Sequence, residues 1–289
     1  MLASRNRGAP LGAEITPVEP DPVRTGEGRS VIVPRCLTIA TSDSGGGAGI
    51  QADLKAFAAA GSHGMSVLVA LTAQNTVAVT AVHELPSEFV VAQLEAVFDD
   101  IGVDAAKTGM LFSRRLIDTV ADFLAAYRVP LVVDPVMVAS SGARLLQEDA
   151  VATYVERLFP LAAVVTPNLA EAEALAGFRG PRRAVAERIR ELGARAVVVT
   201  GGHGEEQGDL LLDGEGELVI AVERRPRRTT HGSGCTHSAT LAAHLARGAS
   251  LRDAARAAAA AAAAAVANGL EELGAGEGPV DVLAVGAAR

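Results

Sequence analysis

The chain has 289 residues, of which 49% are apolar, 21% charged and 3% aromatic. This balance is typical of a folded protein with a large aliphatic core, and it excludes disordered, collagen-like and disulfide-rich proteins. The net charge of -8 disfavours nucleic acid and anionic membranes as partners.

Residues 1–30 carry four prolines and show no helical or strand period, so we expect a disordered tail there. From residue 31 onward, short β-branched runs alternate with longer amphipathic segments, which predicts βα units around a mostly parallel sheet. Because no linker or composition break divides residues 31–289, we expect one domain.

In chain order, strands are predicted at 36–40, 66–70, 105–107, 131–134, 163–166 and 196–200. Helices are predicted between them at 49–60, 87–101, 113–127, 147–159, 170–176 and 182–192. The runs 209–212 and 218–222 flank Asp213-Gly214, which predicts an antiparallel hairpin at a sheet edge. Two further helices follow at 234–246 and 251–267.

The longest alanine-rich uncharged run, residues 257–270, is shorter than the roughly 20 apolar residues that cross a bilayer, so no membrane span is expected. The two cysteines, Cys36 and Cys235, fit neither a disulfide framework nor a CxxC metal site. We therefore expect a cytoplasmic protein in a reducing compartment.

In open parallel sheets, ligands bind beyond the carboxyl ends of the strands, so polar residues at those points are the candidates for chemistry. The first such segment is a glycine loop, residues 41–49, followed by Gln51 and Asp53. It fits neither a dinucleotide fingerprint nor a GxxxxGK[ST] loop. A tight strand-to-helix turn without a ligand is an equal alternative.

The second segment, residues 230–236, opens a helix with Gly232-Ser233-Gly234-Cys235. Glycines let several N–H groups converge, and the helix start adds partial positive charge, so the segment suits a phosphate or an oxyanion. The same field is expected to lower the pKa of the Cys235 thiol. The alternative is that Cys235 is a small buried hydrophobe.

The third segment carries Asn168 and Glu171, which either cap a helix or reach a hydrated Mg²⁺, and the residues alone favour neither. Asp134 ends a predicted strand, where a turn-forming role is the alternative. Gln74 and the stretch from Lys107 to Met110 also follow predicted strands, where the alternative is loop polarity or, for Met110, core filling.

Taken together, these segments resemble the hydroxymethylpyrimidine/phosphomethylpyrimidine kinases of the ribokinase-like superfamily. The motifs are GGAGIQADLK at 46–55, AQNT at 73–76, KTGM at 107–110, DPVM at 134–137, TPN at 166–168 with Glu171, GGH at 201–203 and THGSGCT at 230–236. They occur in the family's order over about residues 36–281. The resemblance implies a three-layer α/β/α fold with a mostly parallel central sheet.

The resemblance further implies ATP- and Mg²⁺-dependent phosphorylation of 4-amino-5-hydroxymethyl-2-methylpyrimidine, and then of its monophosphate, in thiamine biosynthesis. A homodimer is expected. By the same resemblance, the substrate pocket takes Thr41, Asp53, Gln74, Met110 and Val136. Gly232, Ser233 and Gly234 would form the anion hole beside a catalytic Cys235. Asn168, Thr200 and Gly202 would contact ATP, and Asp134 and Glu171 would serve the metal.

The chain departs from the family's usual pattern at Thr41, where glycine is common, and at Thr200, where lysine is common. These two departures make a pyrimidine-binding protein without catalysis one alternative. Another alternative is a pyridoxal kinase of the same superfamily, because pyridoxal is also a flat heteroaromatic ring with a hydroxymethyl group.

Overall fold

The computed structural model of the chain describes residues 33–137, 150–201, 208–222 and 229–288. From Val33 onward the described residues belong to one compact unit. The tail predicted at residues 1–30 and the predicted site residue Gly202 lie outside the described residues. The extent of the single domain at 31–289 stays a prediction.

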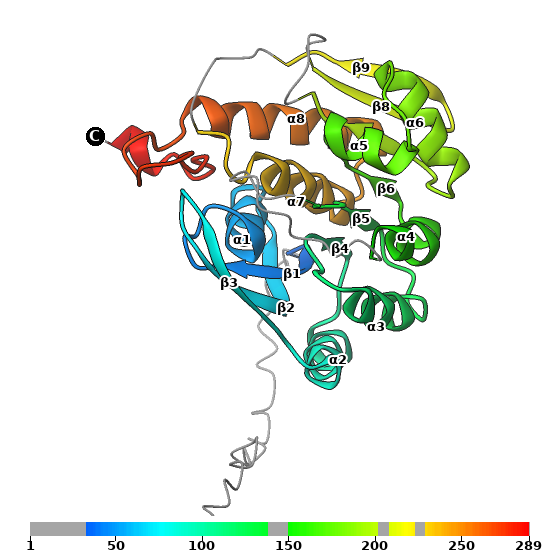
Figure 1. Cartoon of the computed structure of the whole chain (residues 1–289), viewed down its shortest axis with the longest axis horizontal. Coiled ribbons are helices and arrows are strands. Elements are labelled where there is room, and N and C mark those ends of the chain that lie inside the picture. The colour runs from blue at the N-terminus through cyan, green and yellow to red at the C-terminus, as the bar shows by residue number, and fades with distance from the viewer. Residues whose placement is uncertain (1–32, 138–149, 202–207, 223–228, 289) are drawn as a thin grey trace, which may run out of the picture. The chain divides into compact units, whose positions relative to one another are not determined.

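The described residues form a nine-stranded sheet in the order β3-β2-β1-β4-β5-β6-β7-β8-β9 (Figure 1). The strands are β1 (Arg35–Asp43), β2 (His63–Gln74), β3 (Val79–Glu84), β4 (Ala105–Thr108), β5 (Leu131–Val133), β6 (Val164–Val165), β7 (Val197–Val199), β8 (Asp209–Asp213) and β9 (Gly216–Ile220). The six inner strands, β2, β1, β4, β5, β6 and β7, are parallel to one another. At the two edges of the sheet, β3, β8 and β9 pair antiparallel. The predicted α/β class is confirmed.

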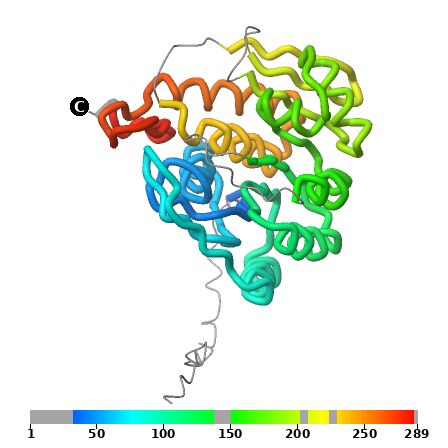
Figure 2. Tube along the Cα trace, viewed as in Figure 1, coloured from blue at the N-terminus to red at the C-terminus, as the bar shows by residue number. Residues whose placement is uncertain are grey.

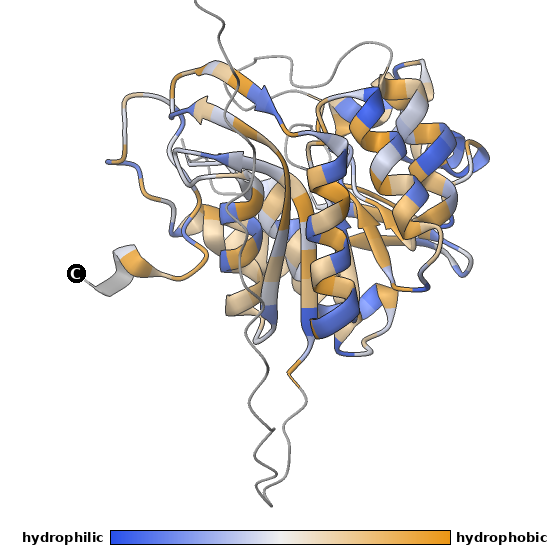
Figure 3. Cartoon of the chain, turned by 90° about the horizontal axis from the view of Figure 1, so that it is seen from below, coloured by the Kyte–Doolittle hydropathy of each residue, from blue (hydrophilic) through white to orange (hydrophobic). Residues whose placement is uncertain are grey.

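Helices cover both faces of this sheet. They are α1 (Gly49–Ala59), α2 (Ser87–Ala96), α3 (Arg114–Leu124), α4 (Ala150–Thr153), α5 (Leu169–Ala176), α6 (Arg182–Glu191), α7 (Ser233–Ala246) and α8 (Leu251–Ala267). One apolar core joins the sheet to α2, α3, α5 and α6, and a second joins it to α1, α7 and α8. Figure 3 shows largely apolar strands between the two helical layers. The predicted three-layer arrangement is confirmed.

Helix α8 has the bounds that its alanine run predicts. Ser250 caps its first turn by accepting a hydrogen bond from the Asp253 N–H at 3.1 Å. Its buried alanines face α7, and their small side chains allow close approach of the two helices. The chain after α8 returns to the turn between β2 and β3, where the Gly276 N–H donates to Thr76 Oγ1 at 3.2 Å (Figure 2).

Two predicted helices are shorter than expected. The helix predicted at 87–101 ends at Ala96 and continues as a π-helical turn, Val97–Ile101, which places the Phe98 ring 5.3 Å from that of Phe123. The described part of the helix predicted at 147–159 is α4, a π-turn and a 3₁₀ turn, Phe159–Leu161. Pro160 lies in that last turn and lacks the N–H that an α-helix requires.

Strand β3 has no counterpart among the predicted elements, and β2 is longer than predicted. Most of β3 is exposed or half-buried, so it lacks the apolar run that marks a buried strand. The hairpin predicted at 209–222 is present as β8 and β9, although β9 begins two residues earlier than expected. No helix in the described part of the chain is long and apolar enough to cross a membrane.

Candidate active site

Two glycine-containing turns meet at the carboxyl ends of the parallel strands. The first joins β1 to α1, and the second opens α7. Gly232 precedes α7 in the left-handed conformation, with φ of 87°. A Cβ atom at this position would lie 1.9 Å from the Gly47 carbonyl oxygen. The close contact of the two turns therefore requires glycine at 232.

The first turn of α7 faces a cavity of about 1300 Å³. Ser233 and Gly234 line it, together with Thr200 and Gly201 just after β7 and residues of β8, β9 and α8. Gly234 is exposed, so its N–H is accessible to a bound group. Helix starts carry unpaired N–H groups and partial positive charge, so this turn is suited to bind a phosphate, although the Ser233 N–H itself donates to the Thr230 carbonyl oxygen at 3.0 Å.

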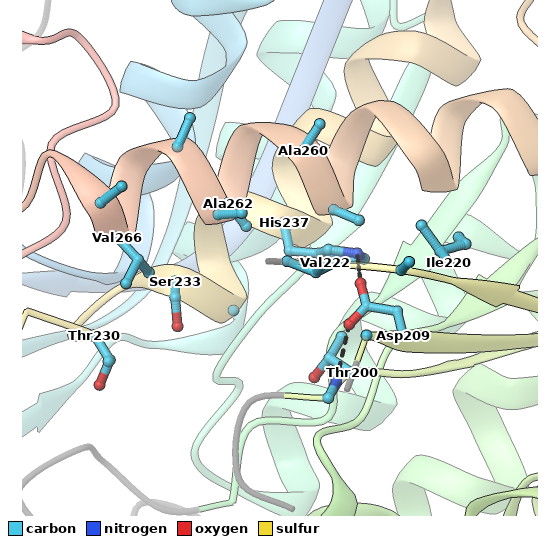
Figure 4. A pocket seen from close by; sticks show the side chains of 18 of the residues that line it. Thr200, Asp209, Ile220, Val222, Thr230, Ser233, His237, Ala260, Ala262 and Val266 are labelled. Atoms are coloured by element: carbon cyan, nitrogen blue, oxygen red, sulfur yellow. Dashed lines mark hydrogen bonds and ion pairs between the residues drawn. The ribbon is translucent and has the colours of Figure 1, made fainter. Parts of the chain in front are cut away.

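The cavity has one apolar wall and one polar end (Figure 4). Alanines of α8 face Ile220 and Val222 across the apolar part. At the polar end, Asp209 Oδ2 lies 3.1 Å from His237 Nε2, and the Gly201 N–H donates to Asp209 Oδ1 at 2.8 Å. The apolar part suits a flat ring such as a nucleobase.

The Asp209 carboxyl is nearly buried, and burial alone would raise its pKa. Hydrogen bonds from His237 and from the Gly201 N–H outweigh this effect and hold its pKa below the ordinary value. Asp209 is therefore a carboxylate that holds the backbone at Gly201, just after β7. Neither it nor His237 was expected at the site, because a single acid at a strand start and a histidine inside a helix are weak signals.

A buried cluster of charges lies behind the anion-binding turn. Lys107 Nζ donates to both oxygens of Asp53, at 2.9 and 3.0 Å, and lies 3.6 Å from Asp134 Oδ2. Thr38 Oγ1 donates to Asp53 at 2.6 Å, and Ser238 Oγ donates to Asp134 at 2.8 Å. Neither Lys107 nor Asp53 is exposed to solvent.

Burial opposes both charges of the Lys107–Asp53 pair, since each must leave water. It raises the pKa of Asp53 in spite of Lys107. For Lys107, burial is outweighed by the surrounding acidic groups, which raise its pKa above the ordinary value. Lys107 is therefore a permanent buried cation that joins α1, β4 and the end of β5.

Cys235 lies in the first turn of α7, half-buried near this cluster. The expectation of a lowered thiol pKa was wrong, because burial raises the pKa of Cys235 to about 12. Lys107 and the backbone of Gly49 favour the thiolate, but Asp53 and Asp134 disfavour it. The field of one helix start is smaller than the cost of taking a thiolate out of water.

The remaining residues of the predicted substrate pocket lie at neighbouring strand ends. Thr41 Oγ1 donates to the Met110 carbonyl oxygen at 3.0 Å, so this side chain bridges β1 to the loop after β4. Gln74 ends β2, where its Oε1 accepts from Thr72 Oγ1 at 3.2 Å. Val136 is half-buried just beyond Asp134.

Asn168 and Glu171 form a capping box at the start of α5. Asn168 Oδ1 accepts from the Glu171 N–H at 2.9 Å, and Glu171 Oε2 accepts from the Asn168 N–H at 3.0 Å. The capping role is thus present, and it does not exclude a ligand. Thr200 lies beside this cap, since its N–H donates to the Pro167 carbonyl oxygen at 2.9 Å, and it lines the cavity.

The Glu171 carboxyl is suited to a cation although it has a cap partner. Burial, with the nearby Asp134, raises its pKa to about 8. A divalent cation beside these two carboxyls would relieve both effects, so the residues fit a magnesium ion that keeps waters and phosphate oxygens as its other ligands. Among the described residues, no group of three or more His, Cys, Asp or Glu side chains could by itself hold a metal ion.

The described structure thus gathers the predicted residues into two adjoining groups. Asp53, Asp134 and Cys235 surround Lys107, whereas Thr200, Ser233 and Gly234 line the cavity. A cavity large enough for a nucleotide beside an anion-binding helix start and a buried charge cluster, on a mostly parallel α/β sheet, is the arrangement that a small-molecule phosphotransferase needs.

Comparison with known proteins identifies the family. The chain belongs to the phosphomethylpyrimidine kinase family, whose model matches residues 43–281. It is 51% identical over 252 residues to the hydroxymethylpyrimidine/phosphomethylpyrimidine kinase of Rhizobium meliloti, covering 84% of this chain and 95% of that protein. It is 48% identical over 256 residues to the enzyme of the same name from Streptomyces coelicolor, covering 87% and 95%.

Solved structures of similar proteins have the same fold. An ADP complex of Bacillus subtilis pyridoxal kinase has a TM-score of 0.80 at 37% identity, and the match covers 88% of this chain and 98% of that one. Phosphomethylpyrimidine kinase from Clostridium difficile has a TM-score of 0.69 at 40% identity, covering 78% and 96%. The predicted family, fold and enzyme class are confirmed.

Proposed function

We propose that this enzyme transfers the γ-phosphoryl group of ATP to the hydroxymethyl group of 4-amino-5-hydroxymethyl-2-methylpyrimidine, and then phosphorylates the monophosphate to the pyrophosphate. One observation carries the proposal. The start of α7 lies between a cavity large enough for a nucleotide and the buried cluster that contains Asp53 and Cys235, which supports phosphoryl transfer at the anion-binding turn.

In the first transfer, the hydroxymethyl oxygen forms a bond to the γ-phosphorus while the bond from that phosphorus to the ADP oxygen breaks. The hydroxyl proton passes in the same step to the Cys235 thiolate, the proposed general base. N–H groups of Gly232, Ser233 and Gly234 are proposed to stabilise the charge on the transferred phosphoryl oxygens, which is the main task in this chemistry. Thr200 and Asn168 are proposed to contact the ATP phosphates, and Gly202 is proposed beside them.

The pyrimidine half of the site is proposed at Thr41, Asp53, Gln74, Met110 and Val136. The position of Asp53 on α1, where Lys107 and Thr38 hold its carboxylate, supports this proposed pocket. Met110 and Val136 supply apolar surface for a flat ring beside it. Since Asp53 is fully buried, the substrate is proposed to meet it at the inner end of the pocket.

Asp134 and Glu171 are proposed to hold Mg²⁺, which would neutralise charge on the phosphate oxygens. Cys235 is proposed as the general base in its thiolate form. With its pKa raised to about 12, that form is a small fraction at neutral pH, so its contribution must grow as the pH rises.

A second candidate substrate is pyridoxal, because solved pyridoxal kinases from Bacillus subtilis and Staphylococcus aureus are similar in fold. The curated relatives at 48–51% identity favour the pyrimidine instead. We also propose a homodimer, which sedimentation velocity tests, and a cytoplasmic location, which agrees with the two free thiols.

The test is product identification. Purified enzyme with MgATP and the hydroxymethylpyrimidine should yield first the monophosphate and then the pyrophosphate by mass spectrometry. Failure to form either product while the pyrimidine binds would instead support the binding-protein alternative.

A further inference from the structure

The two glycine turns of the site are joined by a pair of side chains that no role above requires. Asp43 is the last residue of β1, and His231 precedes Gly232. His231 Nε2 lies 3.0 Å from Asp43 Oδ2, and both residues are buried. A Cβ atom on Gly47 would lie 2.2 Å from His231 Cδ2, so the imidazole packs directly on the first turn.

Asp43 also organises the turn that follows it. Its Oδ1 accepts the Gly45 N–H at 2.8 Å, and its Oδ2 accepts the N–H groups of Gly47 at 3.1 Å and Ala48 at 2.9 Å. Burial alone would raise the pKa of Asp43, but these bonds and His231 hold it below the ordinary value. One carboxylate thus sets the path of the chain into α1, the helix that carries Asp53.

His231 is fixed from the other side by the segment after α8. Its N–H donates to the Gly278 carbonyl oxygen at 3.3 Å, and its own carbonyl oxygen accepts the Val280 N–H at 3.0 Å. That segment is tied to α8, because the Asp281 N–H donates to the Ala265 carbonyl oxygen at 2.9 Å. The ring is therefore held between a backbone ladder and the carboxylate.

We infer that Asp43 and His231 are positioning residues that clamp the turn leading into α1 against the anion-binding turn of α7. This inference rests on the proposed function and assigns a further device to the same site. The clamp fixes the position of α1, which carries Asp53, relative to the N–H groups that would stabilise the transferred phosphoryl group. Displacement of such groups by about 1 Å costs up to ~100-fold in rate.

The experiment compares His231→Ala, His231→Gln and Asp43→Asn with Arg35→Met. Arg35 forms an ion pair with Asp104 at the opposite end of β1, so its loss perturbs the same strand away from the site. We expect kcat to fall by roughly 10- to 100-fold in His231→Ala and Asp43→Asn, with the KM for ATP unchanged. Glutamine at 231 keeps an N–H donor and should recover most of kcat, and Arg35→Met should keep full kcat.

The chain's two cysteines provide a readout that does not depend on activity. Cys235 lies in the clamped turn, and Cys36 lies fully buried in β1. Iodoacetamide labelling at constant pH, resolved by mass spectrometry, should be several-fold faster at Cys235 in His231→Ala and Asp43→Asn, and unchanged at Cys36. Faster labelling at Cys235 alone is the result expected when the first turn of α7 opens locally while β1 stays folded.

Equal acceleration at both cysteines would show global destabilisation and overturn the clamp, as would a folded His231→Ala variant with normal kcat and normal labelling. If the wild-type enzyme formed no phosphorylated pyrimidine, the proposed function would fail, whereas the labelling comparison would still decide whether the clamp exists.

Discussion

Lys107 donates to both carboxylate oxygens of Asp53 in a place that solvent does not reach. The pair joins β4 to α1 beneath the site, and Asp134 lies 3.6 Å from the same ammonium. A buried pair of this kind adds little net stability compared with apolar residues, but removal of one partner leaves an uncompensated charge. The pair therefore fixes the arrangement of the site, and removal of either partner should lower the stability of the folded protein strongly.

Lys107→Met should destabilise the protein by about 3–5 kcal/mol, because Asp53 is left as a buried unpaired acid. Urea unfolding at pH 7 measures this change. The matched variant Lys107→Met/Asp53→Asn removes both charges and should recover part of the loss. The single variant Asp53→Asn completes the comparison. If Asp53→Asn lowered the free energy of unfolding by the same amount in Lys107→Met as in the wild type, the two residues would not be energetically coupled.

The pH dependence of kcat/KM should reflect the raised pKa of Cys235. Since this ratio reports groups of the free enzyme, it should keep rising between about pH 7 and pH 10 without levelling at an ordinary thiol value. Cys235→Ala should lose roughly 10² to 10⁴ in kcat and lose this rise. A plateau near pH 8 would show that the thiol pKa is not raised, and a flat profile with normal activity in Cys235→Ala would remove the base.

Asp209→Asn tests the polar end of the cavity. The folded-state pKa of Asp209 lies below its ordinary value of 3.8, so the unfolded chain binds the proton more readily. The carboxylate therefore contributes stability that is present above about pH 4 and is lost as the pH falls through the folded-state pKa. The variant should lose roughly 1–3 kcal/mol at pH 7, and the difference from wild type should narrow toward pH 3. A difference that is constant with pH in thermal unfolding would contradict this assignment.

Thr200→Lys should lower the KM for ATP by about tenfold, because a hydrogen bond to a charged group contributes roughly 1.5–3 kcal/mol and Thr200 lines the cavity. Steady-state kinetics with varied ATP measure the effect, and Thr200→Met serves as the control for side-chain bulk without charge. An equal change in both variants would show that charge at this position has no role.

Much of the fold follows from patterns that are visible in the sequence. Eight of the nine described strands and helix α8 were predicted, because buried β-branched runs, the turn signal between β8 and β9 and the alanine run are strong local signals. Strand β3 was missed because its side chains are mostly exposed, so it has no such signal. The break after Ala96 depends on packing of Phe98 with Phe123, which local periodicity does not contain.

The candidate site was predicted only in part, since its residues were found by their places after strands and by a family resemblance. Loop polarity was one interpretation of Lys107, although a lysine inside a buried strand is itself a signal of a charged partner. Asp43 and His231 are 188 positions apart, and only the folded sheet brings them together. The thiol pKa of Cys235 was misjudged because the helix start is visible in the sequence, whereas desolvation is a property of the packed structure.

The most direct test of the proposed function is a competition in one reaction, with the hydroxymethylpyrimidine and pyridoxal at equal concentration and MgATP limiting. The ratio of the two phosphorylated products, measured by mass spectrometry, equals the ratio of their kcat/KM values. We predict that pyrimidine mono- and pyrophosphate dominate, and that pyridoxal phosphate is the minor product. Predominant pyridoxal phosphate would contradict the proposed substrate, and the absence of both products would contradict the assignment of this site to phosphoryl transfer.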